Sequence, residues 1–442
     1  MRFLILCFTL SLTFIATPLL TGAAVDRPPV TFNKDVLPIL QRNCQGCHRP
    51  GEAAPMSLLT YREVQPRART IRDAVLHKRM PPWFADSQHG KFANDRSLSE
   101  ADIATLIAWA DGGALEGDAA DQPPARPFVE GWNIGQPDVI FTMPKAFHVP
   151  ASGTINYQHV IIPTGFTEDR WVQMAEVRPG NRTVVHHAAA FIREPGSPWL
   201  RWVKPGEPFE ARHLHAGRLQ KPGSQQGRQR VEEDVRDPEF LTSHVPGSIP
   251  MMLKPGQAKL IKAGSDVVFE LHYSASGKAD TDRTRVGLIF AKEPPATRVL
   301  TRRAMNWTFV IPAGAPNYRV DADLTLPHDT TLLAMLPHMH ARGKAVQYRA
   351  VYPTGESQIL LDVPRYNFKW QLAYYLEEPL LLPKGTRIEC TANFDNSPNN
   401  PDNPDPTVEV RPGLQSWDEM MLCYMDLAVD ASLNSKLLLK QE

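Results

Sequence analysis

The pattern of apolar and polar residues divides this chain into a helical part and a longer part built from short strands. Residues 30–118 contain apolar positions at helical spacing. From about residue 131 onward, short apolar or alternating runs are separated by turns rich in Pro, Gly and Asn. The first part therefore predicts a small all-α domain, and the second predicts all-β sandwiches. The clearest strand-like runs lie at 139–141, 160–162, 267–271, 332–336 and 380–382.

Two helices are predicted at the start of the helical part from the residues that can begin or end them. The first begins at Asn33 or Asp35, either of which can cap it, and runs into Cys44. The second covers about residues 66–79 and ends at Met80–Pro82, because proline cannot continue a helix. Both helices are short, as expected for a small domain.

A third helix and a linker follow. Ser99 and Asp102 form a capping-box pattern at the start of this helix, and Gly112-Gly113 ends it. The composition of Asp118–Pro127 is rich in Ala, Asp and Pro, so we place a linker at residues 119–130.

The chain has 442 residues, which is too many for one compact core. The part with strand texture is long enough for two sandwiches, and we place their boundaries at 131–295 and 296–442. Residues 196–245 are less regular and predict long loops. The tract 396–406 holds so much Pro and Asn that it also predicts a loop.

The N-terminus predicts export. Arg2 is followed by a largely apolar run at 3–20 and by small residues at 22–24, so residues 1–24 read as a signal peptide that leaves a periplasmic or secreted protein. A retained membrane anchor is the alternative, because the run is close to spanning length. No other stretch approaches that length, so no membrane span is expected after cleavage. With 48 basic and 48 acidic residues, nothing favours a nucleic-acid partner.

The sequence Cys44-Gln45-Gly46-Cys47-His48 is a CxxCH motif. Two thiols at this spacing can add to the vinyl groups of one haem, and the adjacent histidine can then bind the iron. Chance, half of a zinc site and a redox CxxC are the alternatives. The export signal and the helical surroundings favour one covalent haem c, with His48 as an axial ligand.

Met80 is the predicted sixth ligand of the haem, because a thioether suits an electron-transferring haem and raises its potential. His77 and Met56 are rivals, and Met80 packing in the core is a further alternative. The order of helix, CxxCH, helix, methionine and helix resembles class I cytochromes c.

Histidines in the strand-rich part form two candidate metal-binding groups. The first histidine group comprises His186, His187 and His272, and the second comprises His338 and His340. Residues two apart on a strand point to the same face, so the second pair can chelate one metal ion. The adjacent pair can do so only at a bulge or a strand end. Imidazole suits Zn, Cu, Fe and Ni alike, so these histidines do not select the metal.

A thioether beside the second group would indicate copper that passes through Cu(I). Met420 is the candidate, and chemistry alone does not exclude Met421 or Met425. His213 and His215 form another pair two residues apart, but they lie where no strand is predicted, so we assign them no role.

The order of these motifs resembles the copper type II, ascorbate-dependent monooxygenases, the family of peptidylglycine α-hydroxylating monooxygenase and dopamine β-monooxygenase. The chain has a VHH motif, an apolar strand ending in HY, an HxH motif followed by Gly343-Lys344, and then Asp-Glu-Met. The resemblance covers about residues 131–442 and implies two β-sandwich domains with two copper ions. It implies that the electron-transfer copper binds His186, His187 and His272, and that the oxygen-activating copper binds His338, His340 and Met420.

Two positions depart from the peptide-hydroxylating branch of that family. There an arginine and an asparagine bind a substrate carboxylate, whereas this chain has Leu336 and Leu422; Tyr424 keeps the expected aromatic residue. A glycine-extended peptide is therefore not the expected substrate. The family's cysteine directly after the methionine is replaced by Met421, with Cys423 two residues further on.

Cys390 and Cys423 are the cysteines that remain once the haem motif and Cys7, in the signal peptide, are set aside. In an oxidising compartment they can form a disulfide, and two buried thiols are the alternative. The sequence leaves both possibilities open.

Together these features predict an exported monooxygenase that hydroxylates a C–H bond of an unknown small substrate with O2. Electrons would enter through the haem from a small reductant or a redox protein. Glu270, two residues before His272, is expected to be an ordinary outward-facing strand residue; the alternative is that it orients a ligand or lies near the electron-transfer copper. The alternative is a non-enzymatic carrier of electrons or copper, in which the sandwiches only dock partners. A β-scaffold that has lost its function is a third possibility, and the intact ligand set argues against it.

Overall fold

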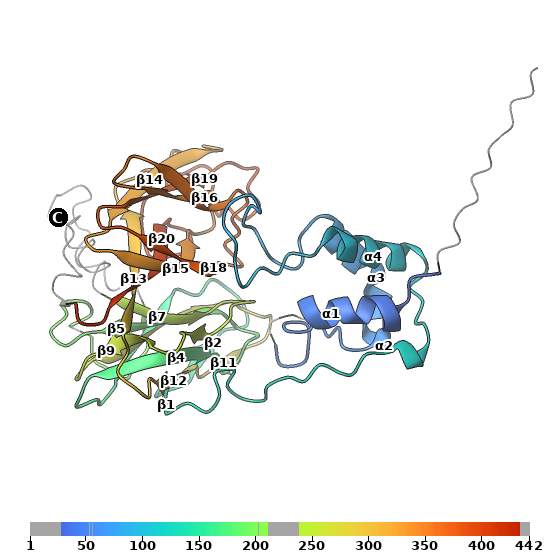
Figure 1. The fold of residues 1–442 in the computed structure, drawn as a ribbon, viewed down its shortest axis with the longest axis horizontal. Coiled ribbons are helices and arrows are strands. Elements are labelled where there is room, and N and C mark those ends of the chain that lie inside the picture. The colour runs from blue at the N-terminus through green and yellow to red at the C-terminus, as the bar shows by residue number, and fades with distance from the viewer. Residues whose placement is uncertain (1–27, 53, 55, 202, 211–237, 434–442) are drawn as a thin grey trace, which may run out of the picture.

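The computed structural model shows a small helical region joined to two stacked β-sandwiches (Figure 1). It describes residues 28–52, 54, 56–201, 203–210 and 238–433. The predicted signal peptide and the pair His213 and His215 lie outside the described residues. None of the helices in the described part is long and apolar enough to cross a membrane.

The helical region contains short helical segments packed around one apolar core. Trp109 and Leu106, from the helix at Glu100–Asp111, are fully buried against Phe32, Val36 and Leu40 from the two N-terminal helical segments. Helices this short depend on such packing for their stability. The segments are η1 (Phe32–Val36), α1 (Leu37–Asn43), α2 (Tyr61–Val64), η2 (Gln65–Arg67), α3 (Ala68–Leu76), α4 (Glu100–Asp111) and η3 (Ala119–Asp121).

The caps of these helices agree with the sequence at one end of the region and differ at the other. Ser99 Oγ accepts a hydrogen bond from Asp102 N at 3.0 Å, as predicted for the start of α4. At the start of the first helix, neither Asn33 nor Asp35 is the cap. The chain makes a π-helical turn there, so Thr31 takes the cap position, and the Asp35 carboxylate accepts from Thr31 N at 2.8 Å.

The first sandwich holds a sheet of β1, β12, β4 and β9, with β8 on β4, facing a sheet ordered β6-β3-β10-β5-β7. A ribbon of β2 and β11 lies beside them. The strands are β1 (Val139–Thr142), β2 (Phe147–Val149), β3 (Gln158–Pro163), β4 (Arg170–Arg178), β5 (Val185–Arg193), β6 (Phe209–Glu210), β7 (Glu239–His244), β8 (Met251–Met252), β9 (Gln257–Ile261), β10 (Asp266–Tyr273), β11 (Asp280–Asp282) and β12 (Arg285–Phe290).

The second sandwich packs a sheet ordered β13-β20-β15-β18 against one ordered β14-β19-β16-β17. The predicted loop at 396–406 contains no helix or strand. The strands are β13 (Thr297–Asn306), β14 (Tyr318–Thr325), β15 (Thr330–His338), β16 (Gly343–Val351), β17 (Ser357–Val363), β18 (Tyr374–Leu382), β19 (Arg387–Phe394) and β20 (Met421–Asp430).

One sheet runs through both sandwiches. β9 pairs in parallel with β13, so the strands on either side form a single nine-stranded sheet. Lys259 on β9 reinforces this junction from within, because its Nζ donates to Thr301 Oγ1 at 2.6 Å and pairs with Asp426 Oδ1 at 3.3 Å. Backbone and buried side-chain bonds therefore fix the two sandwiches against each other.

The segment after Met80 leaves the helices and lies on the second sandwich (Figure 1). Phe92 forms an antiparallel bridge with Leu376, and Ala93 N donates to Tyr375 O at 2.9 Å. The rings of Trp83 and Phe92 pack 5.0 and 5.5 Å from the Tyr374 ring. Residues 30–118 are therefore not a separate body, since part of this range belongs to the core of the second sandwich.

Cys390 and Cys423 lie on β19 and β20, on opposite sheets of the second sandwich, and each is 1% exposed. Both are free thiols in this structure, so it shows the second of the two states that the sequence allowed.

Candidate metal centre between the two sandwiches

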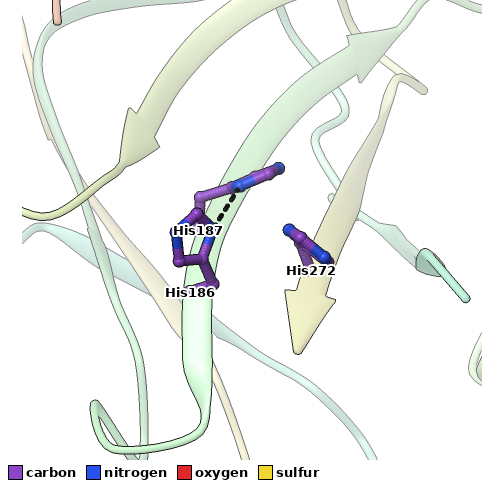
Figure 2. Close-up of side chains that lie close together, drawn as sticks. All are labelled: His186, His187 and His272. Carbon is purple, nitrogen blue, oxygen red and sulfur yellow. Dashed lines mark hydrogen bonds between the residues drawn. The ribbon is translucent and has the colours of Figure 1, made fainter. Parts of the chain in front are cut away.

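The first histidine group converges at one end of β5 and β10 (Figure 2). His187 stands opposite His272 in the strand pairing, and the register then shifts so that Val185 stands opposite Tyr273. His186 is therefore the extra residue of a bulge, which lets adjacent histidines point to one site as the sequence required. One nitrogen from each ring lies within 4.8 Å of the others.

The nitrogens of this group fit a transition-metal ion. His186 Nδ1 and His187 Nδ1 face each other at 3.3 Å, and His272 Nδ1 is buried without a hydrogen-bond partner among the described residues. Burial lowers the pKa of all three, that of His272 to about 3, so the rings are neutral and able to bind metal. Metal–nitrogen bonds of about 2 Å place bound nitrogens at most about 4 Å apart, so only a small inward adjustment is needed.

The second histidine group lies at the end of β15, with the rings of His338 and His340 5.2 Å apart and perpendicular. Each ring is oriented through Nδ1. His338 Nδ1 donates to Gln371 Oε1 at 2.6 Å, and His340 Nδ1 donates to Asp418 O at 3.2 Å. Such partners fix the ring and leave Nε2 for a metal. Burial lowers the pKa of both imidazoles.

Met420 is the methionine that accompanies this second group. It lines the same pocket as His338 and His340, whereas Met421 and Met425 are buried in the apolar core of the second sandwich. Of the three methionines that the sequence left open, Met420, directly before β20, is therefore the one that lies at the second histidine group.

Glu419 connects the two parts of the second group, a role that the sequence reasoning missed. Its side chain is fully buried, and burial raises its pKa to about 8. The carboxylate oxygens accept hydrogen bonds from the backbone nitrogens of His340 at 2.9 Å, Arg342 at 2.6 Å and Met420 at 3.2 Å. One side chain therefore positions the chain on both sides of the site.

Two further residues of the HxH loop explain its local sequence. The buried guanidinium of Arg342 donates to Asn396 Oδ1 at 2.7 Å and to Trp417 O at 2.8 Å, which ties this loop to the long loop before β20. At Gly343 any Cβ would approach Met339 Cβ to 2.7 Å and the Tyr366 ring to 2.8 Å. The buried arginine was not signalled by any pattern, because its partners are distant in the chain.

Both histidine groups border the same aromatic residues. The Tyr157 ring stacks 4.7 Å from the His272 ring and lies 6.4 Å from the His340 ring. Phe368, from the second sandwich, lies 6.0 Å from both His186 and His340. One aromatic ring therefore separates the two groups on each of these paths.

A pocket with a volume of about 140 Å³ opens between the sandwiches and is lined by His187, His338, His340 and Met420. Most of its wall is apolar. Leu336, Leu422 and Tyr424, the three positions compared with the peptide-hydroxylating branch, also line it; the remaining apolar side chains include Ala189, Phe191, Trp199, Leu200, Phe240 and Leu414.

Two charged side chains line this pocket that the sequence reasoning placed elsewhere or missed. Glu270 is not an outward-facing strand residue: it lines the pocket, and its Oε2 lies 3.1 Å from His159 Nε2. The pairing with His159 helps hold its pKa below the ordinary value. This face of β10 is turned toward the second sandwich, and the alternation of residues along the strand does not show what covers the face. Arg303, from β13, was not signalled at all.

The CxxCH motif lies at the end of α1. His48 N donates to Cys44 O at 2.9 Å, and His48 Nδ1 donates to Met56 O at 3.3 Å, which leaves Nε2 without a hydrogen-bond partner among the residues that the structure describes. Burial raises the pKa of Cys47. Met80 is partly buried.

The two rivals of Met80 differ in which of their atoms make contacts. Met56 provides the carbonyl that fixes His48. The exposed His77 ring bonds Asp73 O at 2.9 Å and faces the Asp73 carboxylate at 3.1 Å.

The CxxCH segment contacts the first sandwich directly. Glu52 forms an ion pair with Arg182, which lies in the loop leading into β5. Arg49 binds the same carboxylate at 2.8 Å and stacks 4.4 Å from the Phe128 ring in the linker. The candidate haem segment is thus held beside the strand that carries His186 and His187.

Comparisons with known proteins do not identify a family for this chain. No model of a protein family matches the sequence, and no curated protein matches it. The chain is similar to the major capsid protein P2 from bacteriophage PM2, at 9% identity over 66% of this chain and 99% of that one, with a TM-score of 0.23. It is also similar to the VP2 subviral particle of infectious bursal disease virus, at 9% identity over 69% and 74%, with a TM-score of 0.17. These scores are too low to support an argument.

Proposed function

We propose that this chain is an exported monooxygenase with one haem c and two copper ions, which hydroxylates a C–H bond of a small substrate with O2. The observation that carries the proposal is the meeting of two histidine groups at one apolar pocket, with Tyr157 between them. The order of their motifs resembles the copper type II, ascorbate-dependent monooxygenases.

Copper is the metal favoured for both groups. Three imidazoles of the first group suit several metals, whereas a thioether beside two imidazoles selects copper among them. His186, His187 and His272 would hold one ion, and His338, His340 and Met420 would hold the other. When bound, copper supplies electron transfer at the first group and oxygen activation at the second.

The haem would be held by thioether bonds to Cys44 and Cys47, with His48 and Met80 as axial ligands. It supplies a one-electron carrier. The chain's own part is to dock this segment on the first sandwich through Glu52 and Arg182, so that it lies next to the first histidine group. This docking supports the haem, rather than a soluble reductant alone, as the entry point for electrons.

The remaining residues orient the ligands and exclude water. Gln371 and Asp418 fix the imidazoles of the second group, and Glu419 fixes the backbone around them. The apolar wall lets a substrate approach the second group without ordered water around it.

Metal analysis combined with oxygen uptake tests this proposal. We expect two coppers per haem, and oxygen uptake when a reductant and a substrate are added. The His338→Ala variant should keep the haem spectrum and one copper but lose turnover. Finding no copper, or turnover that survives in this variant, would refute the assignment. Copper without turnover on any substrate would favour the non-enzymatic carrier.

The link between haem and copper needs its own measurement. The haem is reduced under anaerobic conditions and then mixed with oxygen in a stopped-flow instrument. We expect rapid haem reoxidation in the unmodified chain and slow reoxidation in His187→Ala. Equal rates would show that electrons do not pass through the first group.

A further inference from the structure

Arg303 brings a positive charge to a pocket whose wall is otherwise mainly apolar. It lies on β13 opposite Tyr424 on β20, and Tyr424 lies opposite Leu336 on β15. The guanidinium carbon lies 5.5 Å from the centre of the Tyr424 ring. Arg303, Tyr424 and Leu336 therefore form one row across three neighbouring strands, along the wall that leads to His338.

One donor of this guanidinium bonds the Tyr424 hydroxyl, and another retains free hydrogen-bonding capacity. Its Nη2 is buried and has no hydrogen-bond partner among the described residues. No carboxylate of the described part forms an ion pair with it, whereas the adjacent Arg302 pairs with Glu239 at 3.4 Å. The pocket's own acid, Glu270, is paired with His159 instead. A buried arginine donor without a partner is costly unless a ligand supplies the acceptor.

The distance from Arg303 to the second histidine group limits the size of that ligand. His338 lies two strands from Arg303 and two residues further along the sheet. Strands are about 4.8 Å apart and residues rise about 3.4 Å, so the two backbones are separated by roughly 10 Å across and 7 Å along the sheet. Both side chains reach into this interval, so a molecule with a few bonds between its anionic group and its reacting carbon spans it.

We propose that the pocket binds a small amphipathic carboxylate, with the carboxylate on Arg303 and an apolar body against Phe240, Leu422 and Tyr424. Arginine binds carboxylates through two parallel hydrogen bonds, which also orients the ligand. Leu336 and Leu422 cannot bind the carboxylate themselves, and Arg303 supplies the cation from a neighbouring strand. The binding site stands on these contacts alone; only the statement that the bound molecule is the substrate rests on the proposed function.

The test is calorimetric binding to the full-length chain as isolated, without reductant, so that no turnover occurs. The probes are 3-phenylpropanoate, its neutral amide and 3-phenylpropylamine, which share an apolar body. We expect the carboxylate to bind at least about tenfold more tightly than the amide and the amine to bind least. Equal binding of carboxylate and amide would overturn the proposal.

Variants of Arg303 test whether this residue causes the preference for a carboxylate. Arg303→Gln should remove the preference for the carboxylate, and Arg303→Lys should keep part of it, because lysine is cationic but lacks the paired donors. Arg411→Leu, an exposed arginine paired with Glu409, is the matched control and should bind as the unmodified chain does. Thermal unfolding of each variant identifies any that fail to fold. A preference that persists in a folded Arg303→Gln variant would contradict the proposal.

Repeating the titration after copper removal separates this inference from the proposed function. Selective carboxylate binding by the copper-free chain, together with no oxygenase activity of the copper-loaded chain on any carboxylate or amine tested, would retain the site and refute the monooxygenase. Activity on substrates without a carboxylate, with no effect of Arg303→Gln, would support the monooxygenase and refute the carboxylate site.

Discussion

Glu52, four residues after His48, is ion-paired with Arg182, four residues before His186. Their side chains are 17% and 16% exposed, so the pair is largely withdrawn from solvent. Pairs of this kind are weakened less by salt than exposed ones. This contact joins the candidate haem segment to the strand that begins the first histidine group.

Removing the charge at Glu52 should slow electron transfer between the haem and the first histidine group. In Glu52→Gln, Arg182 and Arg49 lose their shared carboxylate, and a loss of about 1.4 kcal/mol in docking corresponds to about a tenfold lower equilibrium constant for docking. We expect haem reoxidation by oxygen to slow by up to about tenfold, with unchanged haem spectrum and copper content. Glu409→Gln, in an exposed pair on the second sandwich, is the control and should have no effect. An unchanged rate in Glu52→Gln would remove this pair from the electron path.

Met80→Ala should lower the midpoint potential of the haem. A thioether axial ligand raises the potential, and axial ligands as a class span roughly 0.8 V. We expect a fall by a substantial fraction of that range, together with a changed visible spectrum, measured by redox titration. Met56→Ala should leave the potential nearly unchanged, since its carbonyl rather than its side chain contacts His48. A large fall in potential in Met56→Ala and none in Met80→Ala would make Met56, rather than Met80, the sixth ligand.

Glu419→Ala should disrupt the second histidine group and destabilise the second sandwich. Three backbone nitrogens would lose their acceptor, and a buried donor without a partner costs about 1–3 kcal/mol. We expect loss of one copper and a drop of several kcal/mol in unfolding free energy. Glu419→Gln keeps an acceptor oxygen and should be intermediate, while the exposed Glu378→Gln serves as the control. Full copper binding in Glu419→Ala would show that the loops hold without it.

Phe92→Ala should detach the segment after Met80 from the second sandwich. The ring is 9% exposed and packs against Trp83 and Tyr374, and truncating a buried phenylalanine costs about 3–5 kcal/mol. Chemical denaturation measures the loss, and limited proteolysis near residue 90 should become faster. Leu381→Ala, at a side chain that is 65% exposed, should change stability by less than about 0.5 kcal/mol.

The thiols of Cys390 and Cys423 should be inert in the folded protein. Burial raises the pKa of Cys390 well above its ordinary value, and only the thiolate reacts, so labelling should stay absent even at mildly alkaline pH. Unfolding without reductant should release two reactive thiols, counted by mass spectrometry after alkylation. If neither is released, the two residues form a disulfide in the isolated protein.

The sequence predicted those features that depend on local periodicity. Strand-length runs indicated the sandwiches, and the adjacency of His186 and His187 indicated that a bulge or a strand end was needed; the pairing with β10 shows a bulge. The cap at Ser99 was also readable from neighbouring residues.

Features that depend on distant contacts could not be read in this way. Glu419 and Arg342 act on segments far from them in the chain, and Arg303 reaches the pocket because β13 lies beside β20. Alternation along one strand predicts an outward-facing Glu270, because it does not show what covers each face of the sheet. Proximity in the sequence places the segment around Phe92 with the helices, whereas its packing contacts place it on the second sandwich.

The continuous sheet through β9 and β13 has a mechanical consequence. A hinge motion that spread the sandwiches would break backbone hydrogen bonds between these strands and expose the buried charge of Lys259. The spacing between the two histidine groups is therefore set when the chain folds, and ligand exchange at the pocket has to use smaller movements. The loop at 364–373 carries Phe368 to the rings of His186 and His340 and Gln371 to the pocket, so its rearrangement could admit a ligand while that spacing stays constant.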